Sequence, residues 1–259
     1  MANNKKTFAI KENYSWYNGN INVTGIKVDL NMQGVACGNG YFISVGKEAR
    51  IFRSQDGIDW QDITTAKFGS TRHFFGIDYD STHKVWIVAA RDGYIIKSDN
   101  DGESWELVHS TGNSDDLLFV VSGNSVVLVI SEGGKVFRST DGGSNWDKYT
   151  WDPITQRPRS VTFAKGVFAA GGYNGTVFYS ADGSEDSWAQ ANSGSKMRIR
   201  GITYSPGLDL WVAGGMEVCT SKNLKKWNFQ FNISNKFNLP DQVYCGCGGC
   251  KYHKHNIIG

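Results

Sequence analysis

The C-terminal tail of the chain gathers side chains that bind metals. Three of the five cysteines lie there with two histidines, all within eleven residues: Cys245, Cys247, Cys250, His253 and His255. Thiolate and imidazole are ligands for a soft ion such as Zn²⁺, so we expect a Zn²⁺ site in this tail. Their spacing is irregular for a zinc finger, and the same cysteines could form a disulfide or remain free thiols. The sequence leaves these alternatives open.

Two pairs of arginines form a second group with chemical potential. The stretches "RPRS" and "RIRG" place Arg157 and Arg159 41 residues before Arg198 and Arg200. Guanidinium groups brought together repel one another unless they meet anions. We therefore expect either rim arginines that pair with local carboxylates or a patch that binds an anion or a partner protein.

Carboxylates also recur in a turn that contains serine, glycine and tryptophan. The fullest copy, "VFRSTDGGSNW", contains Ser139, Asp141, Gly143 and Trp146. Serine and aspartate oxygens can accept backbone N–H groups in such a turn, glycine supplies a positive φ, and tryptophan buries a large ring. A catalytic carboxylate would be unique, whereas this one recurs five times, so we interpret the turn as structural. Its residues are Ser54, Asp56, Gly57, Trp60, Ser98, Asp101, Gly102, Trp105, Ser139, Asp141, Gly143, Trp146, Ser180, Asp182, Trp188, Ser221 and Trp227.

The elements that hold these turns repeat along the chain. The five serines are spaced by 44, 41, 41 and 41 residues. Each repeat contains two apolar runs joined by a tight turn such as Asn39-Gly40, then a third run entering the serine turn and a fourth leaving through the tryptophan. Four antiparallel strands in a period of about 41 residues are typical of a β-propeller blade. The sequence predicts an all-β propeller of five blades over residues 31–234, an extension over 1–30 that adds a ring-closing strand, and a tail over 235–259.

Composition excludes several classes of protein. Lys and Arg number 27 against 25 Asp and Glu, so we expect no general nucleic-acid surface. No apolar run is long enough to span a bilayer, and residues 1–20 lack the apolar core of a secretory signal. We expect a chain made in a cytoplasm, without membrane insertion.

The repeated turn resembles the Asp-box, or BNR repeat, S-x-D-x-G-x-x-W. Asp-boxes occur in sialidases, and the resemblance raises the possibility of a glycosidase with an arginine triad. The Arg-Ile-Pro motif of that family is absent here. Arg53 and Arg138 precede their box serines at equivalent positions, so they belong to outer strands and do not converge on a centre. We therefore expect a protein that is not an enzyme.

The sequence of the blades, "VACGNGYFISVG…IFRSQDGIDW", resembles that of propellers in bacteriophage virion proteins. That resemblance implies a structural component of a tail, baseplate or capsid surface within a large assembly. Its partners would be other virion proteins or a host surface glycan, and its location the virion. The repeat is also similar to photosystem II assembly-factor propellers, which carry an arginine patch. Because those have an export signal and more blades, we favour the virion interpretation.

A lectin-like module is the alternative. Four tryptophans, if exposed between blades, could stack on sugars: Trp16, Trp86, Trp151 and Trp211. Trp86 and Trp211 occupy equivalent second-strand positions, which favours a core role for them. Cys37 and Cys219 fall in strands and are expected to be small core residues.

Overall fold

The computed structural model describes residues 31–112, 115–151, 158–196 and 198–232. These form twenty strands in five antiparallel sheets of four, and within each sheet spatial order follows chain order. The predicted all-β fold of five four-stranded blades is confirmed. Blade 1 contains β1 (Met32–Gly38), β2 (Tyr41–Gly46), β3 (Ile51–Ser54) and β4 (Gln61–Asp62). Blade 2 contains β5 (Phe74–Asp80), β6 (Val85–Ala90), β7 (Tyr94–Ser98) and β8 (Glu106–Ser110). Blade 3 contains β9 (Leu117–Gly123), β10 (Val126–Ser131), β11 (Lys135–Ser139) and β12 (Asp147–Thr150).

Blades 4 and 5 repeat the same pattern. Their strands are β13 (Ser160–Ala164), β14 (Val167–Gly171), β15 (Thr176–Ser180) and β16 (Ala189–Asn192); and β17 (Gly201–Ser205), β18 (Leu210–Gly214), β19 (Glu217–Ser221) and β20 (Asn228–Asn232). In blades 1, 3 and 4 the first hairpin turns where two successive residues have positive φ, as at Asn39 (47°) and Gly40 (81°). Such a turn matches the right-handed twist of the strands that it joins.

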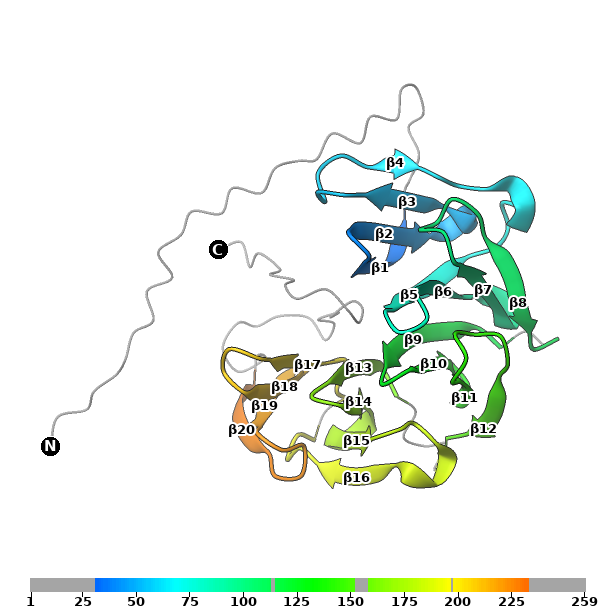
Figure 1. The fold of residues 1–259 in the computed structure, drawn as a ribbon. Coiled ribbons are helices and arrows are strands. Elements are labelled where there is room, and N and C mark those ends of the chain that lie inside the picture. The colour runs from blue at the N-terminus through cyan, green and yellow to red at the C-terminus, as the bar shows by residue number, and fades with distance from the viewer. Residues whose placement is uncertain (1–30, 113–114, 152–157, 197, 233–259) are drawn as a thin grey trace, which may run out of the picture.

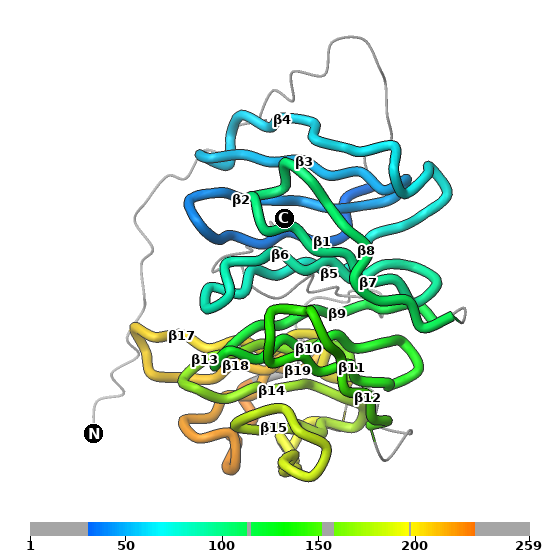
Figure 2. Tube along the Cα trace, turned by 45° about the vertical axis from the view of Figure 1, so that its right-hand side comes forward, coloured from blue at the N-terminus to red at the C-terminus, as the bar shows by residue number. Residues whose placement is uncertain are grey.

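The blades follow one another around an arc. The innermost strands β1, β5, β9, β13 and β17 each pack along the next. Figure 1 shows that blade 1 and blade 5 are the two ends of this arc. In the turned view of Figure 2, the sheets of blades 1, 2 and 3 stack face to face.

The core lies between the blades, because the second strands of blades 2, 3 and 4 are covered on both faces. All six residues of β6 are buried, and they alternate between two neighbours. Trp86 and Val88 pack with Ile43 of blade 1, whereas Ile87 packs with Val129 of blade 3. A strand buried on both sides needs an apolar residue at nearly every position, which explains the continuous run "VWIVAA".

Two expectations about isolated residues have different outcomes. Cys219 is buried as predicted, but Cys37 is exposed, because it lies on the face of blade 1 that points away from blade 2.

Across the described ranges the helical elements are short 3-10 turns, and none of them has the length and apolarity of a membrane-crossing helix.

Candidate functional site

In all five serine turns the serine hydroxyl accepts the backbone amide two residues later. In blade 3 the Ser139 hydroxyl accepts from the Gly143 amide (2.8 Å) and donates to Asp141 (2.8 Å). The Asp141 carboxylate also accepts from the amides of Ser144 and Asn145. The Trp146 indole closes the loop by donating to the Gly143 carbonyl (3.0 Å). The side chains of Ser139, Asp141 and Trp146 are all engaged within the turn, which fits an architectural role.

The second copy of the turn corrects a residue assignment. Asn100, rather than Asp101, receives the Ser98 hydroxyl (3.0 Å) and the Ser104 amide (2.9 Å). Asp101 has a positive φ of 56° and turns toward other partners. Its carboxylate accepts from Asn39 of blade 1 (2.8 Å) and from the Trp86 indole (3.2 Å). An amide oxygen can replace the carboxylate in the turn, so Asp101 is free to connect two blades.

The fourth copy contains an extra residue before its tryptophan, and its closure differs. In blades 1, 2, 3 and 5 the indole donates to a carbonyl three residues earlier in the chain. In blade 4 the Trp188 indole donates instead to the Tyr149 hydroxyl of blade 3 (2.9 Å). That hydroxyl donates in turn to the Gly183 carbonyl (2.7 Å), the acceptor that the indole would otherwise use.

Arginines on the third strands connect neighbouring blades. Arg53 donates to the Asp101 carbonyl of blade 2 (2.9 Å), and Arg138 donates to the Asp182 carbonyl of blade 4 (3.0 Å). Both lie away from the innermost strands, as their repeat positions predicted. They are engaged in joining blades and do not gather around one point.

Two arginines of the predicted patch, Arg159 and Arg198, meet at the side chain of Tyr173. We call these three residues the Tyr173 cluster. Tyr173 begins the 3-10 turn between β14 and β15. The Arg159 guanidinium donates to its hydroxyl (2.6 Å), and the Arg198 guanidinium carbon lies 4.2 Å from its ring centroid. Arg159 immediately precedes β13, and Arg198 lies close before β17. Arg200 immediately precedes β17, and its amide donates to the Gly214 carbonyl. Arg157 lies outside the described residues.

The electrostatics of the Tyr173 cluster leave positive charge available. Within the described ranges neither Arg159 nor Arg198 forms an ion pair with a carboxylate. The Arg159 Nε atom is buried and has no hydrogen-bond acceptor there. Arg198 is exposed. The half-buried guanidinium of Arg159 and the exposed guanidinium of Arg198 can together hold a carboxylate or a run of peptide carbonyls.

The remaining site predictions can be placed only in part. Trp86, Trp151 and Trp211 are buried at 0%, 4% and 2% exposure, so they are unavailable to sugars. They are core residues because each packs against a neighbouring blade. Trp16 and the five tail residues proposed for Zn²⁺ lie outside the described residues. In the part of the chain that the structure describes, no three His, Cys, Asp or Glu side chains come together as a metal site.

Comparisons with known proteins identify the family. Residues 9–248 match the family described as "Photosynthesis system II assembly factor YCF48". A photosystem II assembly lipoprotein Ycf48 from Synechococcus sp. (strain CC9902) is 22% identical over 213 residues, which are 79% of this chain and 64% of that protein. The chain thus spans less than two thirds of that relative's length.

Solved structures give the same fold. "YCF48 bound to D1 peptide" superimposes with a TM-score of 0.60 at 15% identity, over 77% of this chain and 68% of that one. YCF48 from Cyanidioschyzon merolae gives a TM-score of 0.58 at 14% identity, over 80% of this chain and 73% of that one. At these identities the likeness shows the BNR-type β-propeller fold alone.

The family match overturns the favoured interpretation of the sequence. The expectations of a bacteriophage virion component, of virion or host-glycan partners and of a virion location were wrong, because the relatives are photosystem II assembly proteins. The sequence pattern of strands and turns that suggested a phage protein is common to Asp-box blades, so it does not distinguish one propeller family from another. At the level of the family, an assembly factor agrees with the expectation of a protein that is not an enzyme. With most of its length matched by that family's model, this chain belongs to the photosystem II assembly factor YCF48 family.

Proposed function

We propose that this chain is a non-enzymatic assembly factor that holds a peptide segment of a photosystem subunit through the Tyr173 cluster. The observation that carries the proposal is the meeting of Arg159 and Arg198 on one aromatic side chain without a carboxylate partner among the described residues. A solved relative is bound to a D1 peptide, which supports a peptide as the ligand class.

The residues of the cluster suit a peptide better than a reacting substrate. Arg159 is half-buried, and one of its terminal donors is already used by Tyr173. A peptide carboxylate or carbonyl would accept from its remaining terminal N–H groups, and the exposed Arg198 would add a charge-assisted hydrogen bond. The phenol ring keeps both guanidinium groups near one another, so the ligand meets a prepared pair of cations.

A binding experiment tests the proposal directly. A fluorescently labelled synthetic D1 peptide is titrated with the purified chain, and anisotropy gives the dissociation constant. The double variant Arg159→Ala, Arg198→Ala is expected to bind about tenfold more weakly or worse, since each charged hydrogen bond is worth roughly 1.5–3 kcal/mol.

The matched control removes the same charge elsewhere. Lys148 and Lys226 are exposed on blades 3 and 5, outside the cluster. The variant Lys148→Ala, Lys226→Ala should bind as the unmodified chain does. Equal weakening in both double variants would mean that only net charge matters, and an unmodified chain that ignores the peptide would refute the proposal.

A further inference from the structure

Blade 1 has a neighbouring blade on one side only, within the part of the chain that the structure describes (Figure 1). Ile43, Val45 and Ile51 pack toward blade 2 with Trp86 and Val88. Residues that alternate with them must point the other way, because side chains of a strand alternate between the two faces. Strand pairing places these on the opposite face: Val35, Cys37, Phe42, Ser44 and Phe52.

This opposite face, which we call the end face of blade 1, has the character of a face between blades. Phe42 pairs with the box serine Ser54 and with Cys37. Trp211 occupies the same place in blade 5, paired with Ser221 and Tyr204, and there it packs against blade 4. The five residues of the end face are apolar or small, and none carries a charge. Such a surface is expected to be covered in a folded protein.

We propose that residues 9–30 of the same chain cover the end face of blade 1 as the outer part of a further blade. The path of the chain is the first reason. In each described blade the chain reaches the innermost strand from the outermost strand of the blade before, as from β4 to β5 and from β16 to β17. The same path predicts an outermost strand immediately before β1.

The sequence before β1 gives two further reasons. The family model already matches from residue 9, so repeat-like sequence begins well before Met32. Trp16 precedes β1 by 16 residues, compared with 14 residues from the box tryptophan Trp60 to the start of β5 at Phe74. Ile21 and Val23 alternate with asparagines, which gives one apolar side to a strand.

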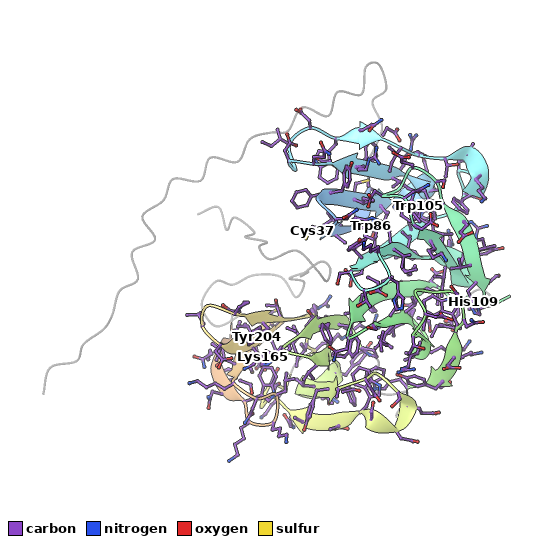
Figure 3. The ribbon with its side chains drawn as sticks, in the orientation of Figure 1. Cys37, Trp86, Trp105, His109, Lys165 and Tyr204 are labelled. Atoms are coloured by element: carbon purple, nitrogen blue, oxygen red, sulfur yellow. The ribbon has the colours of Figure 1, made fainter. Side chains whose placement is uncertain are left out.

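Cross-linking of the full-length chain tests which segment covers the end face. Cys37 lies on this face and is exposed, so its thiol is the anchor (Figure 3). Cys245, Cys247 and Cys250 are changed to serine, and the buried Cys219 is kept. A second cysteine is placed at Ile21 or Val23, and a short bis-maleimide is added. We expect a cross-link within one chain, detected by mass spectrometry.

Two controls separate docking from the random encounters of a tethered segment. In a Cys37→Ser background, Thr150→Cys provides an anchor on the exposed outer strand of blade 3, where no cross-link to residues 21–23 is expected. Asn256→Cys tests whether the C-terminal segment reaches Cys37 instead. Cross-links to both anchors, to neither anchor, from position 256 alone, or between two chains would each overturn the proposal.

Stability supplies a second measurement that does not depend on cross-linking geometry. The variant Ile21→Asp, Val23→Asp should lower the melting temperature by several degrees, because two charges would face an apolar surface. The matched variant Asn20→Asp, Asn22→Asp adds the same charge on the alternate side and should change it little. Equal melting temperatures for the two variants would count against docking of this segment.

Discussion

The Tyr149 hydroxyl lies between the Trp188 indole and the Gly183 carbonyl, so a side chain of blade 3 completes the turn of blade 4. The side chain is buried, and burial raises the pKa of Tyr149 to about 12. Trp188 also packs on Trp151, with ring centroids 4.2 Å apart. An insertion in one repeat is thus accommodated by a neighbouring blade.

Removal of this hydroxyl should destabilise the protein measurably. Tyr149→Phe leaves a buried carbonyl and an indole N–H without their partner, at an expected cost of about 1–3 kcal/mol in the free energy of unfolding. Urea denaturation gives this value. Tyr41→Phe is the matched control, since Tyr41 is half-buried and keeps its ring over Arg53. Equal stability of the two variants would show that the Tyr149 hydroxyl contributes nothing.

The sequence was informative where a physical requirement recurs in every repeat. Five copies of one turn predicted five blades, because each blade needs the same closure. The hydrogen bond from Asn39 to Asp101 could not be predicted, since it depends on a contact between two blades. Likewise, Tyr149 carries no motif, and its role follows from an insertion 35 or so residues later.

The functional residues were predictable only by position. The 41-residue spacing predicted that two arginine pairs occupy equivalent places, but Tyr173, on which Arg159 and Arg198 meet, was missed. A tyrosine in the turn before the third strand has no periodic signal. The blades resembled both phage virion propellers and photosystem II assembly factors, and the second resemblance was right. The repeats alone could not decide between them, because Asp-box geometry constrains the same residues in propellers of unrelated function.

The Asp141 carboxylate in the serine turn of blade 3 should make the stability of the fold sensitive to acid. Burial disfavours the charge of Asp141, but hydrogen bonds from Asn145, Ser139 and Ser144 outweigh it and lower the pKa to about 2. The ionised form is thus stabilised in the folded state, and this stability is present above pH 4 and lost as pH falls toward 2. Asp141→Asn should keep the turn, as Asn100 does in blade 2, and should reduce the loss of stability between pH 4 and 2.

Urea midpoints at several values of pH between 2 and 5 measure this effect. Asp147→Asn, an exposed substitution in the same blade, is the control and should leave the acid dependence unchanged. Asp141→Ala should lower stability at every pH, because the amides of Ser144 and Asn145 lose their acceptor. Parallel acid curves for Asp141→Asn and the unmodified chain would contradict the assignment.

Close approach between blades 3 and 4 depends on a glycine. A Cβ atom at Gly123 would lie 2.2 Å from the Phe163 ring, far inside contact distance. Gly123→Ala should therefore separate the two blades locally, at a cost of about 1–3 kcal/mol. Thermal unfolding followed by circular dichroism measures the loss. Gly207→Ala is the control, because a Cβ there meets nothing within 4 Å. An unchanged melting temperature for Gly123→Ala would mean that Phe163 moves aside freely.

A carboxylate on an innermost strand should give the protein a pH dependence near neutrality. Asp78 of β5 accepts from the Ser122 amide of β9 (2.7 Å) and from the Tyr79 amide (2.9 Å). Loss of solvent around the carboxylate raises the pKa of Asp78 to about 7, although these hydrogen bonds oppose the rise. The folded chain then keeps a proton that the unfolded chain releases near pH 4. Stability should fall as pH rises from 4 to 7 and level off above it.

Asp78→Asn removes this titration and should flatten the curve between pH 4 and 7. The expected difference across that range is about 1–3 kcal/mol, reduced from the full linkage value because the side chain keeps some contact with solvent. Burial lowers the pKa of His109, which gives a slope of opposite sign, but it is common to both proteins and cancels in the comparison. Asp186→Asn, an exposed substitution in blade 4, is the control. If Asp78→Asn and Asp186→Asn follow the same curve, the pKa of Asp78 is not raised in the folded protein and the prediction is wrong.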